Sequence, residues 1–166
     1  MTHHGAAGVE VRQAARADLF DVVRIETRSF PQPWPVGAFE RFLGDPGFLV
    51  AADSDGESDR DVVGFVVADP VDTHGPPVGH VKDIAVHPDH RERGVGATLL
   101  DRALAALRDA GAETATLEVR EDNEAARSLY DRFGFDELRT VEGYYDDGED
   151  AVVYVRDLQG ATDRRE

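Results

Sequence analysis

The stretch from Gly79 to Val119 limits the possible folds more than any other part of the chain. A strand pattern at Gly79 to Val86 is followed by a helix pattern from about Gly94 to Ala110, where leucines recur at helical spacing and Gly111 supplies the stop. A second strand pattern comes at Thr114 to Val119, with apolar and polar residues alternating. A strand, a helix and a strand in this order predict a βαβ unit.

The segments on either side of this unit predict antiparallel pairs. Phe48 to Ala52 and Val62 to Ala68 have strand patterns, and the polar connection Asp53 to Asp61 is typical of a hairpin with a mobile surface loop. Phe135 to Val141 and Ala151 to Asp157 form a second such pair. The other expected elements are a strand at Val9 to Gln13 and helices at Asp18 to Phe30, Val36 to Leu43 and Asn123 to Phe133.

This order, β-α-α-β-β-β-α-β-α-β-β, predicts an α/β fold of the mixed α+β kind. We expect a mixed, mostly antiparallel sheet of about seven strands with helices on both faces. The chain has 166 residues, 41% of them apolar, and no convincing internal linker, so it fits one domain. We place that domain at residues 9–158, between flexible ends at 1–8 and 159–166.

Charge and composition exclude several classes of function. With 34 acidic and 18 basic residues, the formal net charge is -16, whereas binding nucleic acid or an anionic membrane needs a basic surface. The absence of cysteine removes disulfides, thiolate metal sites and cysteine nucleophiles. No helical i, i+4 pairing of histidines is present, so no metal site is expected.

The same composition predicts a cytoplasmic address. No apolar run approaches the roughly 18 residues of a membrane span, and the polar start of the chain lacks the apolar centre of a signal peptide. Lys82 is the single lysine among the basic residues, which are otherwise arginine. Abundant carboxylates with few lysines indicate a salt-rich cytoplasm, where salt screens the repulsion between the carboxylates. A halophilic source is therefore one hypothesis, and a merely acidic protein is the other.

The segment Ile84 to Gly96 carries the most specific chemical signal. It leads from a strand through an Arg- and Gly-rich turn into the long helix. A helix N-terminus offers unpaired backbone N–H groups and a partial positive charge, and glycines let a diphosphate approach the backbone closely. The segment is neither a Walker A loop nor a GxGxxG fingerprint. It therefore predicts an anion cradle of another kind.

The motif Arg91-x-x-Gly94-x-Gly96 after an Ile-Ala-Val-x-Pro strand resembles the acetyl-CoA signature of the GNAT acetyltransferases. The resemblance extends from Val9 to Leu158. Its further superfamily motifs are Leu117-Glu118-Val119-Arg120, Asn123-x-x-Ala126-x-x-Leu129-Tyr130 and Gly134-Phe135. Within the superfamily, the chain resembles the RimI type through the Leu-Glu-Val-Arg strand, Phe30-Pro31, Trp34 and Tyr144-Tyr145 with Gly148-Glu149-Asp150. RimI-type enzymes are ribosomal-protein-alanine N-terminal acetyltransferases, and their archaeal members are similar to the catalytic subunit of the eukaryotic N-terminal acetyltransferase A complex.

The resemblance implies acetyl-CoA as the cosubstrate and a sheet splayed at its site. The pantetheine arm would pair with the backbone of Ile84 to Val86, and the diphosphate would bind the N–H groups of Arg93 to Thr98. The cofactor residues implied are Ile84, Ala85, Val86, Arg91, Arg93, Gly94, Val95, Gly96, Ala97, Thr98, Asn123, Ala126 and Tyr130. The plainer alternatives are solvated arginines at 91 and 93 and a helix cap at Asn123.

The resemblance also implies two catalytic residues. Glu118 matches the family's base, acting directly or through water, and the alternative is a surface carboxylate paired with Arg120. Tyr130 would protonate the CoA sulfur, and the alternative is a core tyrosine. The N–H of Val86 is the natural oxyanion donor. His80 and Asp83 share the central strand and are reserve candidates for the base.

Two loops are expected to hold the acceptor. Phe30, Pro31 and Trp34 come from the proline-rich loop, and Tyr144 and Tyr145 from the hairpin loop Glu142 to Asp150. Rings and prolines form rigid walls, although Phe30 and Trp34 could equally be core.

The function expected is transfer of acetyl from acetyl-CoA to the α-amino group of a protein N-terminus, such as a ribosomal protein starting with Ala or Ser. Acetylation of a lysine or a small-molecule amine on the same fold is one alternative. A noncatalytic acetyl-CoA-binding subunit is another. We expect a monomer or weak homodimer, with no nucleic-acid or membrane partner.

Overall fold

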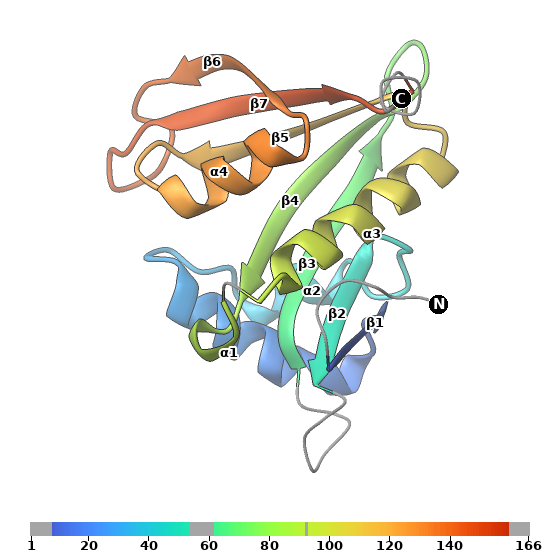
Figure 1. Ribbon diagram of the computed structural model, residues 1–166, viewed down its shortest axis with the longest axis vertical. Helices are drawn as coiled ribbons and strands as arrows, with labels where there is room; N and C mark the ends of the chain where they lie inside the picture. Colours follow the sequence, from blue (N-terminus) through green and yellow to red (C-terminus); the bar gives the residue numbers. More distant parts are fainter. Residues whose placement is uncertain (1–7, 54–61, 92, 160–166) are drawn as a thin grey trace. The chain divides into compact units, whose positions relative to one another are not determined.

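The computed structural model describes residues 8–53, 62–91 and 93–159 (Figure 1). Its strands are β1 Val9–Gln13, β2 Phe48–Asp53, β3 Val62–Val71, β4 Val78–Val86, β5 Thr114–Arg120, β6 Asp136–Val141 and β7 Ala151–Asp157. Its α-helices are α1 Leu19–Ser29, α2 Val36–Glu40, α3 Val95–Asp109 and α4 Glu124–Arg132, and 3-10 turns lie at Arg16–Asp18 and Pro88–His90. The expected order of strands and α-helices is confirmed.

A few element boundaries differ from the prediction for local reasons. Helix α2 ends at Glu40 instead of Leu43, because the next N–H groups bond carbonyls three residues back and Gly44 then takes φ +92°. Strand β3 continues past Ala68 to Val71. The predicted mobile loop at 54–61 and nearly all of the two predicted flexible ends lie outside the described residues.

The seven strands form one mixed sheet in the order β1-β2-β3-β4-β5-β7-β6. Strands β4 and β5 pair in parallel, as the βαβ pattern predicted. The pairs β1–β2, β2–β3, β5–β7 and β6–β7 are antiparallel. The mixed, mostly antiparallel sheet expected from the sequence is therefore confirmed.

The chain forms two compact units. The first contains residues 1–69 and 83–106, and the second contains residues 70–82 and 107–166. The boundary falls within β4 and within α3, so each of these elements contributes residues to both units.

Neighbouring residues of β3 show how helices cover both faces of the first unit's sheet. The ring of Phe65 meets Phe39 of α2 edge-on at 5.4 Å between centroids, within a core that also contains residues of α1. A Cβ placed on Gly64 would lie 3.1 Å from Leu99 and 3.2 Å from Val95, both on α3. Because successive residues of a strand face opposite sides, α1 and α2 cover one face and α3 covers the other.

The second unit builds its core from β5, β7 and α4. Strand β5 alternates as predicted, with Ala115, Leu117 and Val119 buried. Tyr130 of α4 packs its ring 5.8 Å from the ring of Tyr154 on β7. These contacts cover the apolar face of β5 and leave its polar face for the site.

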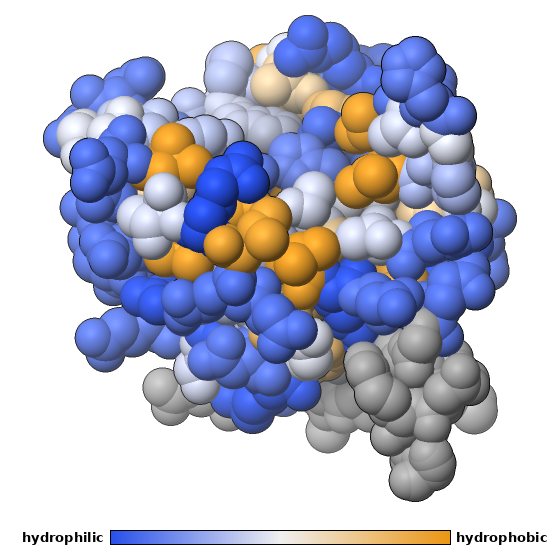
Figure 2. All heavy atoms as spheres, turned by 90° about the horizontal axis from the view of Figure 1, so that it is seen from above, coloured by the Kyte–Doolittle hydropathy of each residue, from blue (hydrophilic) through white to orange (hydrophobic). Residues whose placement is uncertain are grey.

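The surface is hydrophilic, as the charge predicts. Hydrophilic residues surround small apolar patches on the face shown in Figure 2. Among the described residues, the exposed large hydrophobic side chains are Phe20, Val36, Val71, Leu138 and Tyr144. No described helix has both the length and the apolar character needed to cross a bilayer.

Candidate active site

In the first unit, a short loop connects β4 to α3. Gly94, directly before the helix, has φ +85°, a left-handed conformation that glycine adopts without strain. The N–H of Thr98 donates to Gly94 O at 3.0 Å, so helical hydrogen bonding begins there. The N–H groups in the first turn of α3, from Val95 to Ala97, have no acceptor inside the helix. Anion binding at this helix start stays a prediction.

Arg91 ties this loop to two other parts of the first unit. Its Nε donates to Val86 O at 2.9 Å, and its Nη2 donates to the Ser29 hydroxyl at 3.2 Å. Arg91 is exposed, and these two hydrogen bonds attach its side chain to the ends of β4 and α1. Its contact with a diphosphate stays a prediction.

The described ladder between β4 and β5 covers only the first half of β4. Val78 to Val81 pair with Thr114 to Leu117, whereas β4 continues to Val86 and β5 to Arg120. Ile84, Ala85 and Val86, which are predicted to pair with pantetheine, are outside that ladder.

In the second unit, Glu118 of β5 belongs to a chain of three polar side chains. His80 Nε2 lies 2.7 Å from Glu118 Oε1, and Lys82 Nζ lies 3.2 Å from His80 Nδ1. An ammonium group only donates hydrogen bonds, so Nδ1 accepts and the imidazole proton is assigned to Nε2, which donates to Glu118. The chain therefore runs from an amine through an imidazole to a carboxylate.

The hydrogen bond from His80 lowers the pKa of Glu118. Burial opposes this shift, and the positive charges of Lys82 and Arg139 reinforce it. Partial desolvation, and then the charge of Glu118, raise the pKa of Tyr144, whose side chain is half exposed. Glu118 is not paired with Arg120 as in the alternative considered above.

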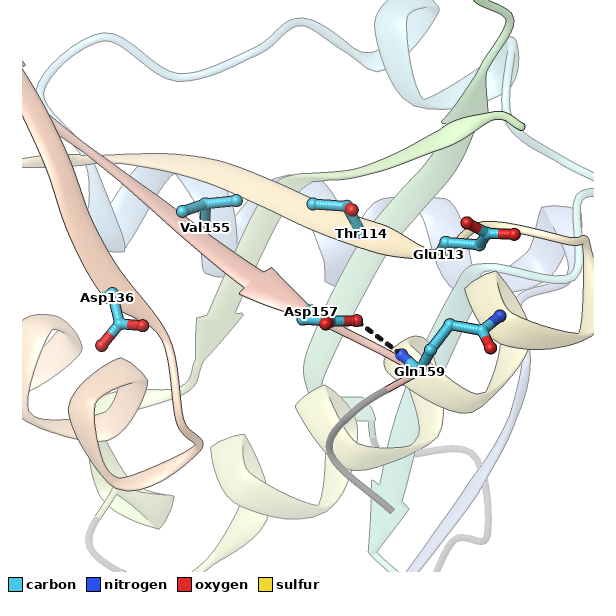
Figure 3. Close-up of a pocket in the computed structure, with 6 residues that line it drawn as sticks. All are labelled: Glu113, Thr114, Asp136, Val155, Asp157 and Gln159. Atoms are coloured by element: carbon cyan, nitrogen blue, oxygen red, sulfur yellow. Dashed lines mark hydrogen bonds between the residues drawn. The ribbon is translucent and has the colours of Figure 1, made fainter. Parts of the chain in front are cut away.

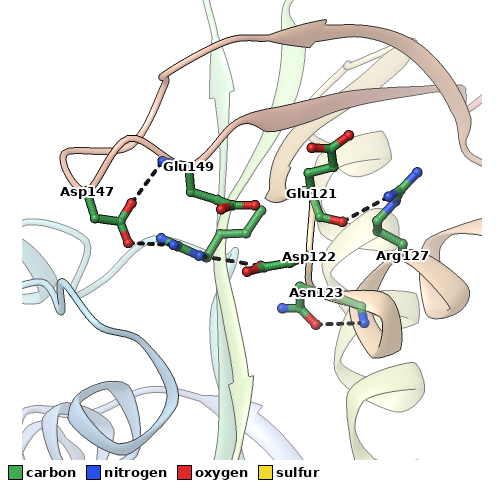
Figure 4. A network of polar contacts seen from close by, with 8 residues as sticks. Glu121, Asp122, Asn123, Arg127, Asp147 and Glu149 are labelled. Carbon is green, nitrogen blue, oxygen red and sulfur yellow. Dashed lines mark hydrogen bonds and ion pairs between the residues drawn. The ribbon is translucent and has the colours of Figure 1, made fainter.

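Arg120 instead holds the hairpin loop that carries the two tyrosines. Its Nη2 lies 2.6 Å from Asp147 Oδ2, and its guanidinium lies 4.9 Å from the centroid of the Tyr145 ring. Asp147 also accepts a hydrogen bond from the N–H of Glu149 (Figure 4). Tyr144 and Tyr145 meet edge-on at 4.9 Å. These contacts hold the hairpin loop, one of the two loops predicted to bind the acceptor, in a defined conformation.

Asn123 and Tyr130 sit at the start and near the end of α4. The Asn123 side chain accepts a hydrogen bond from the N–H of Ala126 at 3.1 Å, so it caps the helix (Figure 4). Tyr130 is 4% exposed, with its ring against Phe135 and Tyr154. Both residues thus have structural roles, and their predicted contacts with the cofactor stay predictions.

The proline-rich loop of the first unit is fixed by a buried glutamate. Glu26 of α1 is 2% exposed, and its Oε2 accepts a hydrogen bond from the N–H of Trp34 at 2.9 Å. The Trp34 ring packs 5.0 Å from Phe39, and Phe30 also packs on this core, while Pro31 is exposed. Phe30 and Trp34 are therefore half-buried residues that pack on the core and also shape the loop.

Besides Trp34, Glu26 has a second neighbour, the carboxyl group of Asp83, and the sequence analysis missed this contact. Burial, and then a hydrogen bond with Glu26, raise the pKa of Asp83 on β4 well above its usual value. Glu26 Oε1 and Asp83 Oδ2 are buried and accept no hydrogen bond from an N–H or hydroxyl group of the described residues. A proton on Asp83 satisfies both oxygens. The available signal was a glutamate within the apolar stripe of α1.

The second unit contains a pocket at one end of β5 and β7. Its lining is Glu113, Thr114, Asp136, Val155, Asp157 and Gln159, and Asp157 accepts a hydrogen bond from the N–H of Gln159 (Figure 3). None of the predicted site residues lines it. Its three carboxylates would repel a diphosphate, so this pocket does not suit the cosubstrate.

Comparison with known proteins decides the family. A profile of the acetyltransferase (GNAT) family matches residues 19–135, more than half of the chain. The chain belongs to the GNAT acetyltransferase family. This GNAT acetyltransferase therefore has the enzyme class expected from the sequence, an acetyl-CoA-dependent acyltransferase.

Named relatives cover most of this GNAT acetyltransferase. It is 35% identical over 160 residues to the N-alpha-acetyltransferase of Sulfolobus acidocaldarius, covering 90% of this chain and 92% of that protein. It is 31% identical over 139 residues to the ribosomal protein bS18-alanine N-acetyltransferase of Escherichia coli K12, covering 82% and 88%. The crystal structure of Ard1 from Thermoplasma volcanium matches with a TM-score of 0.81 at 25% identity, covering 91% and 98%.

Proposed function

We propose that this GNAT acetyltransferase acetylates the α-amino group of a protein N-terminus. One observation carries the proposal: Glu118, the predicted base, is hydrogen-bonded to His80 on the neighbouring strand. The names of the relatives from Sulfolobus acidocaldarius and Escherichia coli support an N-terminal amine as the acceptor. An N-terminus starting with Ala or Ser, such as that of a ribosomal protein, is the substrate we propose.

The residues at the start of α3 fit the diphosphate of acetyl-CoA. The first turn of the helix supplies N–H donors, and Gly94 leaves room for a close approach of the diphosphate. We assign the diphosphate to the N–H groups of Arg93 to Thr98, with positive charge from Arg91 and Arg93. We assign the pantetheine to the backbone of Ile84 to Val86, as an added strand would bind.

The proposed chemistry needs a neutral amine. A peptide α-amine has a pKa of about 7.7 to 8.0, so much of it is charged at neutral pH. A glutamate carboxylate is ionised throughout this range, and the hydrogen bond from His80 further stabilises the charged form of Glu118. Glu118 would accept the amine proton, directly or through water. The N–H of Val86 would stabilise the carbonyl oxygen, and Tyr130 would return a proton to the CoA sulfur.

We propose action in the cytoplasm, as the acidic, lysine-poor composition predicts. A monomer or weak homodimer stays a prediction.

The acceptor is tested with a panel of short peptides and acetyl-CoA, by measuring CoA release in concentrated KCl. Peptides starting with Ala or Ser are expected to turn over. Peptides with a blocked N-terminus and an internal lysine are expected to react far more slowly. Preference for the blocked peptides would contradict the proposal. Cofactor binding without turnover on any amine would identify a noncatalytic acetyl-CoA-binding subunit instead.

The base is tested with Glu118→Gln, which keeps the shape of the side chain and removes its charge. We expect unchanged acetyl-CoA affinity and a turnover about a hundredfold lower at neutral pH. Glu113→Gln, a change at an exposed residue directly before β5, is the matched control. Unchanged rates in Glu118→Gln would move the base elsewhere, first to His80.

A further inference from the structure

Lys82 is chemically unusual in this chain. Every other basic residue of the Lys and Arg kind is arginine. An arginine stays charged in proteins and is a poor acyl acceptor, whereas a lysine amine can lose its proton. The single side-chain amine of the chain is half-buried on β4, beside His80.

Lys82 meets the geometric requirement of an acceptor amine. Such an amine must lie within hydrogen-bond reach of the group that removes its proton. Lys82 Nζ is 3.2 Å from His80 Nδ1, and His80 Nε2 is 2.7 Å from Glu118 Oε1. The imidazole can therefore take a proton from the amine on one nitrogen while giving one to the carboxylate from the other.

Strand β4 also leads from Lys82 toward the proposed cosubstrate site. Ile84, the first residue assigned to the pantetheine, follows two positions later in the same strand. Lys82 and the backbone assigned to the pantetheine therefore lie close together along β4.

We propose that Lys82 Nζ is a self-acetylation site, which takes its acetyl group from acetyl-CoA bound to the same chain. The inference rests on the proposed function, because it uses the same cosubstrate and the same base. Lys82 is an internal amine that competes with the α-amine of the acceptor.

The step balances in atoms and protons. Lys82 Nζ gives one proton to His80 Nδ1 while His80 Nε2 gives its proton to Glu118. The neutral amine attacks the thioester carbonyl carbon, a C–N bond forms and the C–S bond breaks. CoA leaves as a thiolate and receives the second proton lost by the nitrogen. The products are an amide on Lys82, the CoA thiol and a proton on Glu118 that passes to solvent.

Self-acetylation would change the base that it uses. The groups that lower the pKa of Glu118 are His80, Lys82 and Arg139, and the neighbouring Tyr144 is neutral. An acetylated Lys82 has no charge, so one of these influences is lost and the pKa of Glu118 rises. The amide N–H still donates to His80, so the chain of hydrogen bonds is retained.

The experiment incubates the full chain with acetyl-CoA and no peptide, then maps acetylated residues by mass spectrometry. We expect one acetyl group on Lys82, at a rate per chain that does not change with protein concentration. Glu118→Gln is expected to lower this rate about a hundredfold. Lys82→Arg is expected to remove the modification while keeping a positive charge. Circular dichroism and cofactor binding establish that each variant is folded.

A parallel assay with an Ala-starting peptide separates the two proposals. Peptide acetylation with an unmodified Lys82 would overturn the self-acetylation and leave the proposed function standing. Equal acetylation of Lys82 in Glu118→Gln would show a direct chemical reaction and would also overturn it. A rate per chain that rises in proportion to protein concentration would show transfer between molecules, against the proposal. No acetylation of peptide or lysine would refute both proposals.

Discussion

His80 Nε2 on β4 lies 2.7 Å from Glu118 Oε1 on β5, so an imidazole N–H stabilises the charged form of the predicted base. For the α-amine of the acceptor, His80 is a positioning residue, because it acts on that amine's proton through Glu118. Its removal should therefore alter how activity depends on pH, beyond any change in rate.

His80→Phe removes the donor and keeps a ring. We expect kcat/KM to fall about tenfold or more and the pKa of Glu118 to rise. In the unchanged enzyme, log kcat/KM should fall with slope one below the pKa of the α-amine and with slope two below the lowered pKa of Glu118. The second break should move to higher pH in His80→Phe and less in His80→Gln, which retains an N–H donor. A break that stays in place would contradict this role.

Arg120 is expected to affect the acceptor and not the cofactor. Its contacts with Asp147 and Tyr145 hold the hairpin loop, and the exposed ion pair itself contributes little to folding. Arg120→Gln should raise KM for the peptide roughly two- to fivefold, with KM for acetyl-CoA and Tm unchanged. Arg102→Gln on the exposed face of α3 is the control. A rise in KM for acetyl-CoA alone would contradict the assignment of this loop.

The Glu26–Asp83 pair makes a signed prediction for stability. Burial and Glu26 raise the pKa of Asp83 in the folded state, so folded chains hold this proton more tightly than unfolded ones. The contribution of Asp83 to the free energy of unfolding is therefore largest at low pH. This contribution decreases as the pH rises from the pKa of an aspartate in the unfolded chain, about 3.9, through the pKa of Asp83 in the folded chain.

Asp83→Asn replaces the protonated acid by a neutral donor to Glu26. Relative to the unchanged chain, the variant should gain stability as the pH rises from about 4 through the folded pKa of Asp83, as measured by urea unfolding in constant KCl. Asp101→Asn on the exposed face of α3 serves as the control. An equal stability difference at both ends of this pH range would show that Asp83 does not carry the extra proton.

Gly94 is predicted to be necessary for the start of α3. Its φ of +85° lies in the left-handed region, where a residue with a Cβ costs about 1–2 kcal/mol. Gly94→Ala should lower the free energy of unfolding by about that amount and raise KM for acetyl-CoA more than KM for the peptide. Gly37→Ala in α2 is the matched control, since a Cβ there meets no atom within 4 Å. Equal effects of the two substitutions would argue against a special role of Gly94.

The formal net charge of -16 predicts a stability that depends on salt. Raising KCl from about 0.1 M to about 1 M shortens the Debye length from about 10 Å to about 3 Å and screens the repulsion between carboxylates. Thermal unfolding should therefore shift to higher temperature. Equal stability in very dilute buffer would remove the halophilic hypothesis.

The order of the elements could be predicted because each pattern is local. The alternation at Thr114 to Val119 and the glycine stops at 111 and 134 depend on residues close in sequence, and the structure reproduces them. The 3-10 turns and the early end of α2 were missed. Single turns of i to i+3 hydrogen bonds leave almost no periodicity in a sequence.

The candidate site was only partly predictable. The resemblance identified Glu118, but its partner is 38 residues away at His80, and the spacing of the two residues contains no trace of the contact. The contact of Glu26 with Asp83 was likewise missed, because the packing of α1 against β4 brings the two residues together, and many distant residues contribute to that packing. The contact of Lys82 with His80 is local, since the two residues are two positions apart in β4 and share a face of the strand.

The sequence by itself determined the elements, their order, the acidic surface and the family motif around Gly94. These follow from backbone preferences, from hydrophobic periodicity and from the count of charges, all of which belong to the chain before it folds. Only the tertiary structure decided which ionisable groups share a proton, namely Glu118 with His80 and Asp83 with Glu26. A pKa depends on burial and on neighbours within a few ångströms, and packing alone brings those neighbours together.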